Sequence, residues 1–204
     1  MIGFSPLNPG VEGKSMSKRR FLLGISATVL LAATVTATLA KPLRLAAPQI
    51  LGLSCLERTC VEDAEDLQRA QDLVRAAVRE VEVLTGQTVP PLTLVLCSTS
   101  ECYKSFGGDR ERAISFPWLG AVISGPDWQD YIIRHELIHW LQFDRYGAVE
   151  TMSHPTWFRE GMAYALSGAP DWDIPEHYQP MISRYRGWQE QRNLDGLWTT
   201  QPEF

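Results

Sequence analysis

The segment His135-Glu136-Leu137-Ile138-His139 constrains the fold more than any other part of the chain. Its two histidines are four residues apart, and an α-helix turns about 100° per residue, so a helix places both imidazoles on one face. Both rings can then bind one metal ion, with Glu136 beside them. In this HExxH pattern the glutamate activates a water molecule on a zinc ion. The segment therefore predicts a helix with His135 and His139 as zinc ligands and Glu136 as general base.

Apolar residues on both sides of this segment recur at intervals of three and four positions. They predict the buried face of an amphipathic helix that begins near Asp127. The residues of this predicted face are Ile132, Ile133, Leu137, Ile138 and Leu141.

A catalytic zinc ion takes three protein ligands and keeps one position open, so a further ligand is needed. In the extended HExxHxxGxxH pattern it is a histidine, but Gln142 and Arg145 stand where that pattern has glycine and histidine. The other common solution is a glutamate on a following helix, and Glu160 lies in a helical pattern over residues 157–167. Glu160 is therefore the predicted third ligand. Two imidazoles and one carboxylate leave a zinc site with a charge of about +1.

Other assignments for this region stay open at this point. Glu150 and His154 are competing ligands, in a stretch that the sequence predicts as a loop. Alternatively, Glu160 is only a glutamate in the first turn of a helix, where the helix dipole favours it, with Thr156 as the N-cap.

The HELIH segment from His135 and the WFREGMA segment from Trp157 together resemble the gluzincin, or peptidase MA-like, metallopeptidases. The resemblance covers about residues 62–168, with looser similarity in the segments before the HExxH motif. It implies a small zincin-like domain, Zn²⁺ as cofactor, Glu160 as a zinc ligand, and a peptide or protein substrate. It also implies that the last strand before the active-site helix, near residues 120–124, forms the edge of the cleft. That segment has no acid to capture a substrate's terminal amine, so cleavage within a chain is expected rather than aminopeptidase activity.

The sequence defines less clearly the hydrogen-bond partners of the ligand histidines and the group that stabilises the reaction intermediate. Asp144 or a backbone carbonyl is expected to accept the N–H of a ligand histidine, because ligand imidazoles generally have such a partner. A side chain that stabilises the oxyanion of the tetrahedral intermediate is also expected. The candidates are Tyr164, His177, Tyr178 and Tyr185.

Residues 1–40 are expected to be an N-terminal signal peptide or membrane anchor, and residues 41–204 a single domain. The segment 14–20 is basic, and residues 21–40 contain no charged side chain, as in an export signal or a membrane-spanning helix. A membrane is therefore a possible partner through residues 21–40. In either case we expect the domain to lie outside the cytoplasm, as a secreted, periplasmic or membrane-anchored protein.

Four cysteines form two Cys-x4-Cys pairs, as in exported proteins. Three disulfide connectivities are possible, and the local pairs Cys55–Cys60 and Cys97–Cys102 are favoured. A thiolate-bound zinc site and four reduced cysteines are the alternatives.

The charge balance indicates what the domain does not bind. Residues 41–204 contain 15 Lys and Arg against 23 Asp and Glu, a net charge of about −8. Such a surface repels nucleic acid, so no nucleic-acid partner is expected.

The order of predicted helices and strands along the chain indicates an α+β domain, with a few-stranded sheet and helices packed on one side. Aromatic residues after Pro170 are expected to anchor a C-terminal cap on the core. The predicted helices are 62–84, 100–106, 127 onward and 157–167, and the predicted strands are 92–97, 113–116 and 120–124.

Three hypotheses follow from the sequence. The leading one is an exported zinc metallopeptidase. The second is a noncatalytic zinc-binding interaction domain, which needs a closed set of four ligands, with His154 or His177 as the fourth. The third is a metal-free surface protein in which the HExxH motif is accidental.

Overall fold

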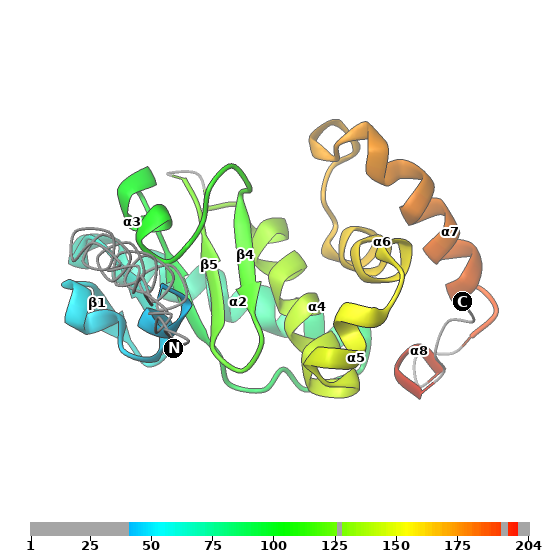
Figure 1. Cartoon of the computed structure of the whole chain (residues 1–204), viewed down its shortest axis with the longest axis horizontal. Helices are drawn as coiled ribbons and strands as arrows, with labels where there is room; N and C mark the ends of the chain where they lie inside the picture. The colour runs from blue at the N-terminus through cyan, green and yellow to red at the C-terminus, as the bar shows by residue number, and fades with distance from the viewer. Residues whose placement is uncertain (1–40, 126–127, 193–195, 200–204) are drawn as a thin grey trace, which may run out of the picture. The chain divides into compact units, whose positions relative to one another are not determined.

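A computed structural model describes residues 41–125, 128–192 and 196–199 (Figure 1). The predicted export or anchor segment, residues 1–40, lies outside the described residues. Among the helices that are described, none is both long and apolar enough to cross a membrane.

A five-stranded mixed sheet forms the centre of the domain, which confirms the α+β class. The strand order is β1-β2-β3-β5-β4; β3 pairs in parallel with β2 and β5, whereas β1 and β4 pair antiparallel to their neighbours. The strands are β1 (Ser54–Leu56), β2 (Thr59–Val61), β3 (Thr93–Leu96), β4 (Ala113–Phe116) and β5 (Gly120–Ile123).

The long helix α2 (Leu67–Thr85) connects β2 to β3 and covers one face of the sheet, after a single 3₁₀ turn, η3 (Ala64–Asp66). It ends at Gly86, whose φ of +66° is a left-handed conformation that glycine adopts without strain. The predicted helix 62–84 is thus confirmed with slightly shifted ends. In its last turn Leu84 is exposed, and the neighbouring Thr85 is buried and donates a hydrogen bond to the Val81 carbonyl.

Short helices cover the opposite face of the sheet, so the expectation of helices on one side only is wrong. They are η1 (Pro42–Ala46), η2 (Pro48–Leu51) and α3 (Ser100–Ser105). Leu45, Tyr103 and Phe106 build a second core there against alternate residues of the strands. The strands β3 and β5 are central and apolar on both faces, and such strands need cover on both.

The hairpin β1–β2 was not predicted from the sequence. Its strands are only three residues long, and Cys55 lies directly opposite Cys60 in the register. Both predicted disulfides, Cys55–Cys60 and Cys97–Cys102, are present in the structure. Two disulfides in a small domain are typical of an oxidising compartment.

The helices after the sheet form the other half of the domain, and Figure 1 shows α4 beside β4, with α6 and α7 beyond it. As predicted, the apolar stripe of α4 is buried against the sheet and α2. The predicted glutamate helix is confirmed as α6. The helices are α4 (Asp130–Tyr146), α5 (Ala148–Ser153), α6 (Thr156–Ser167), α7 (Gln179–Gln189) and α8 (Gly196–Thr199), with 3₁₀ turns η4 (Asp171–Asp173) and η5 (Glu176–Tyr178).

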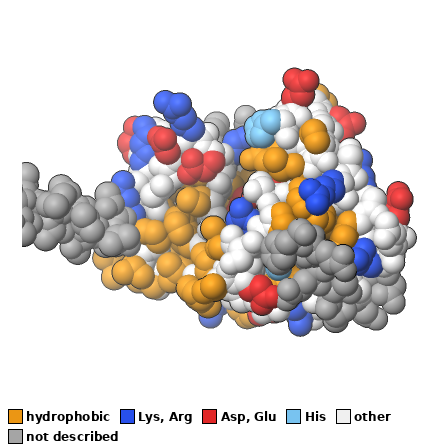
Figure 2. Space-filling model, turned by 45° about the vertical axis from the view of Figure 1, so that its right-hand side comes forward, with side chains coloured by type: hydrophobic (Ala, Val, Ile, Leu, Met, Phe, Trp, Pro, Cys, Tyr) orange, Lys and Arg blue, Asp and Glu red, His pale blue; other side chains and the backbone are white. Residues whose placement is uncertain are grey.

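The C-terminal aromatics mostly anchor this half, as expected. Tyr185 is fully buried in the main core, and the Trp198 indole donates a hydrogen bond to the Thr85 carbonyl of α2. Trp172 differs, because it lies on the surface. Figure 2 shows hydrophobic side chains gathered near one end of the visible face, with charges of both signs spread over the rest.

Candidate metal centre

Three potential ligand atoms converge between α4 and α6. The Nε2 atoms of His135 and His139 are 3.1 Å apart, and Oε2 of Glu160 lies 3.6 Å from the first and 3.5 Å from the second. These three side chains form a group that could hold one ion. The sequence predicted all three.

The size of this triangle fits a zinc ion. Zinc binds imidazole nitrogen and carboxylate oxygen at about 2.0–2.2 Å, so two ligands of a tetrahedral site are about 3.3 Å apart. The three observed separations lie within a few tenths of an ångström of that value. The triangle therefore has the dimensions of three corners of a zinc tetrahedron.

The electrostatics also favour a cation at this point. Burial alone would raise the pKa of Glu160, but the adjacent imidazoles of His135 and His139 lower it well below its usual range, so the carboxylate stays charged. Burial lowers the pKa of His139, but its contact with Glu160 outweighs this and raises the pKa to about 9. In the absence of metal, a proton on this imidazole balances the carboxylate, and a metal cation bound here replaces that proton.

The orientation of His139 is fixed by Gln142, one turn further along α4. Oε1 of Gln142 lies 2.9 Å from Nδ1 of His139, and Nε2 of the same carboxamide donates to the Arg159 carbonyl at 3.1 Å. The second hydrogen bond sets which end of the amide faces the imidazole. Nδ1 then carries the proton, and Nε2 keeps its lone pair for a metal.

For His139 this partner is Gln142, and the predicted acceptors, Asp144 or a backbone carbonyl, do not take this role. Asp144 instead lies beside Arg145 at the surface. The spacing of three residues from His139 could have identified Gln142, because side chains three apart meet on a helix.

Glu136 lies next to the two histidines and is only 5% exposed. The hydroxyl of Ser115, on β4, donates a hydrogen bond to its Oε2. The carboxylate is thus held in place from the sheet side of the site. Ser115 was not predicted as a site residue, because nothing local in the sequence indicates which residue of a strand will face the helix.

Glu160 is held by the packing of α6 rather than by a helix-end effect. The N-cap residue of α6 is Pro155, Thr156 is the first residue of the helix, and Glu160 follows in the second turn. The alternative of Thr156 as N-cap to a first-turn glutamate is therefore wrong. Gly161 allows α7 to approach closely, since a Cβ there would lie 2.6 Å from the Met181 carbonyl oxygen.

The competing ligands are not part of the group. His154 is buried between the rings of Tyr146 and Phe158, and its two ring nitrogens have no hydrogen-bond partner among the described residues. Burial, helped by the charge of Arg159, lowers its pKa. Glu150 belongs to α5, where the sequence had predicted a loop.

A second group of potential ligands consists of Glu62, Cys97 and Cys102. The two cysteines are joined in a disulfide, so they offer no thiolate. Glu62 accepts hydrogen bonds from the backbone N–H groups of Ser98 and Thr99 before α3. This group is a structural feature, which removes the thiolate-zinc alternative.

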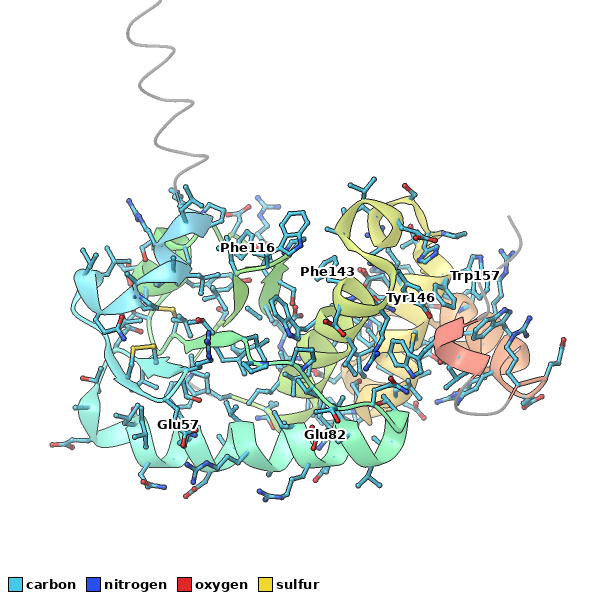
Figure 3. All side chains as sticks on the ribbon, turned by 90° about the horizontal axis from the view of Figure 1, so that it is seen from below. Glu57, Glu82, Phe116, Phe143, Tyr146 and Trp157 are labelled. Atoms are coloured by element: carbon cyan, nitrogen blue, oxygen red, sulfur yellow. A yellow bond between two sulfur atoms is a disulfide. The ribbon has the colours of Figure 1, made fainter. Side chains whose placement is uncertain are left out.

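The candidate metal centre lies in a cleft of about 620 Å³. One wall is β4 and the residues before it, the floor is α4, and the other wall comes from α6 and the segment through η4 and η5. Phe143 projects from α4 into the space between β4 and α5 (Figure 3).

The strand at the edge of the cleft is β4, so the prediction that residues 120–124 form this edge is wrong. β5 is paired on both sides, with β3 and β4, and has no free edge. The chain forms β4 first, turns back over residues 117–119, and returns as β5 between β4 and β3, so that β4 remains the outermost strand. A local sequence pattern does not show which strand of a hairpin is outermost.

Aromatic side chains line the wall opposite β4. The Tyr164 ring packs edge-on against His135 at a centroid distance of 4.5 Å, and Tyr178 lies 4.7 Å beyond it. Both line the cleft, as does His177. Tyr185, the fourth oxyanion candidate, is fully buried in the main core and is not part of the cleft wall.

A polar clamp joins the two walls at one end of the cleft. Asp173 of η4 accepts hydrogen bonds from Arg112, just before β4, and from the hydroxyl of Tyr131 in the first turn of α4. Burial would raise the pKa of Asp173, but these two donors lower it below its usual value. The carboxylate is therefore ionised and bridges the two walls.

No protein-family model, curated protein or solved structure matches this chain in comparisons with known proteins.

Proposed function

We propose that this protein is a zinc-dependent hydrolase of peptide bonds, of the gluzincin type, that cleaves within peptide or protein chains. The observation that carries the proposal is the triangle of His135, His139 and Glu160, whose sides match a zinc tetrahedron. It has three protein ligands and faces a cleft, which is the arrangement of catalytic rather than structural zinc.

His135, His139 and Glu160 would hold the ion. When bound, zinc polarises the scissile carbonyl and lowers the pKa of a water molecule to about 7. Glu136 then accepts a proton from the attacking water and passes it to the leaving amine, while Ser115 keeps its carboxylate in position. Tyr164 and Tyr178, which line the cleft, are our candidates for the side chain that stabilises the developing oxyanion.

The free edge of β4 suits an extended peptide. A peptide backbone that pairs with β4 as an additional strand would lie along the cleft, past the metal centre. The main-chain hydrogen bonds in such a complex are independent of sequence, which fits cleavage within a chain.

We propose that the protein acts outside the cytoplasm. The two disulfides support this, as does the uncharged sequence of residues 21–40. Several apolar side chains are exposed soon after that segment, as expected of a surface close to a membrane: Leu43, Ile50, Leu51 and Leu56. The mixture of charges in Figure 2 and the excess of acids favour no nucleic-acid partner.

The noncatalytic alternative needs a fourth protein ligand. Neither His154 nor His177 belongs to the ligand group found among the described residues. A purely structural site also has no use for the Glu136 carboxylate held beside the ligands. These observations favour the hydrolase.

The test is a comparison of the wild type with Glu136→Gln, Glu160→Ala and His139→Ala. Zinc content is measured by elemental analysis, and hydrolysis with a library of quenched fluorescent peptides. We expect Glu136→Gln to retain about one zinc per chain and to lose activity by at least about a thousandfold. The two ligand variants should lose zinc. If zinc-loaded wild type cleaves no peptide, or if Glu136→Gln remains active, the proposal is wrong.

A further inference from the structure

The side chain of Arg159 lines the metal-site cleft without an acidic partner. None of the ion pairs found in the described part of the chain includes it, and its buried Nε has no hydrogen-bond partner there. The contact seen for its Nη1 is with the Met152 sulfur, 3.5 Å away. Thioether sulfur is a weak acceptor, so this contact does not replace a carboxylate.

Arg159 is half-buried, and its guanidinium remains charged at any ordinary pH. Its buried Nε therefore retains a hydrogen-bond donor that an anionic ligand in the cleft could use. The other arginines of the cleft differ. Arg112 is paired with Asp173, and Arg110 is exposed and therefore solvated. Arg159 is the cleft arginine with unsatisfied capacity for an anion.

The position of Arg159 along the cleft follows from its neighbours. Its carbonyl accepts a hydrogen bond from Gln142, and Phe143 and Met152 line the same part of the cleft. These contacts place it toward the C-terminal end of α4, beyond His139. The clamp of Arg112, Tyr131 and Asp173 lies at the other end, at the first turn of α4.

Two contacts also fix the direction in which β4 runs relative to α4. Arg112, before β4, bonds with Tyr131 early in α4, and Ser115, later in β4, bonds with Glu136 further along the helix. β4 therefore runs in the same direction as α4. A peptide paired antiparallel to β4, the slightly more stable pairing, has its N-terminal residues at the Arg159 end.

From these contacts we infer that Arg159 forms a subsite for an acidic side chain, Asp or Glu, on the amino-terminal side of the scissile bond. This inference rests on the proposed peptidase function and names its substrate class. The planar guanidinium matches a carboxylate in a bidentate pair, and the apolar walls of Phe143 and Met152 can pack against the methylene groups of the acid.

The test uses matched peptides that differ only in one residue before the cleaved bond, as Glu, Gln or Lys. For the wild type, kcat/KM should be at least about tenfold higher for Glu than for Gln, since a hydrogen bond between two charged groups is worth more than a neutral one. Arg159→Gln should remove this preference, mainly by raising KM for the Glu peptide. Arg159→Glu should favour the Lys peptide.

The control is Arg79→Gln, which makes the same change in charge at an exposed position on α2. It should keep the preference for Glu. Zinc content and melting temperature of each variant show that the fold and the metal site are intact. Equal cleavage of Glu and Gln peptides by the wild type would overturn the inference and leave the peptidase proposal standing.

A second measurement separates the two proposals if no cleavage is seen. Binding of uncleaved Glu and Gln peptides to zinc-loaded Glu136→Gln is followed by fluorescence anisotropy. Tighter binding of the Glu peptide that depends on Arg159 supports the subsite even if hydrolysis fails. Equal binding of both peptides refutes it.

Discussion

Gln142 Oε1 accepts a hydrogen bond from Nδ1 of His139, at 2.9 Å, while Gln142 itself is fully buried. The carboxamide thus determines which nitrogen of the imidazole is free to bind a metal. Gln142→Ala should weaken zinc binding about 10- to 100-fold, as loss of a ligand's hydrogen-bond partner generally does. Competition with a chromophoric chelator measures the affinity. Gln142→Glu, which keeps an acceptor, should bind zinc more tightly than Gln142→Ala; equal weakening would argue against an orienting role.

Ser115 should affect catalysis without affecting the metal. Its hydroxyl positions the Glu136 carboxylate, so Ser115→Ala should lower kcat by about tenfold while zinc content stays unchanged. Steady-state kinetics and elemental analysis of the same samples test this. Ser153→Ala, an exposed position on α5, is the control and should leave both quantities unchanged. Loss of zinc in Ser115→Ala would instead indicate a role in building the site.

Gly161 and Gly187 form a matched pair for the packing of α6 against α7. A Cβ at Gly161 would lie 2.6 Å from the Met181 carbonyl oxygen, whereas one at Gly187 meets nothing within 4 Å. Gly161→Ala should lower the free energy of unfolding by about 1–3 kcal/mol. Gly187→Ala should leave it unchanged or raise it by up to about 1 kcal/mol, because alanine favours helix. Urea denaturation compares them, and equal effects would contradict the close approach.

The clamp at Asp173 predicts a dependence of stability on pH. Hydrogen bonds from Tyr131 and Arg112 lower the Asp173 pKa in the folded protein, so its contribution is present above the unfolded pKa of about 4. The contribution is lost as the pH falls through the folded pKa. Asp173→Asn should therefore be less stable than the wild type at pH 7, with a smaller difference below about pH 4. Thermal unfolding at both pH values measures this, and a difference that does not depend on pH would contradict it.

Reduction of the disulfides should destabilise the domain without unfolding the metal site first. Each disulfide closes a short loop, with a sequence separation of 5. A disulfide across a loop of this size raises the free energy of unfolding by about 2 kcal/mol. Urea denaturation with and without a reductant gives the difference. Neither cysteine pair belongs to the group of His135, His139 and Glu160, so the zinc content of the folded, reduced protein should stay constant. Loss of zinc on reduction at low urea would show that the sheet and the site are coupled.

The relative positions of His135, Glu136 and His139 could be predicted because their geometry is local. His135, Glu136 and His139 belong to one helix, whose rise and twist fix their relative positions. The same is true of the buried face of α4. The disulfides were also predictable, because each pair is close in the sequence.

Other features depended on how distant segments meet. Which strand borders the cleft depends on sheet order, and β5, which the sequence favoured, is enclosed on both sides. The contact of Ser115 with Glu136 and the cross-cleft clamp at Asp173 join residues 21 to 61 positions apart.

The sequence by itself determined that this chain has a helix with two histidines and a glutamate on adjacent faces, because helical periodicity is a property of neighbouring residues. Only the tertiary structure decided that Glu160 reaches those histidines, that β4 is the edge strand beside the cleft, and that Arg159 faces the cleft without an acid. These three features come from packing between segments that are distant in the sequence. Burial of apolar surface selects one arrangement of these segments, whereas local secondary-structure propensity does not distinguish between arrangements.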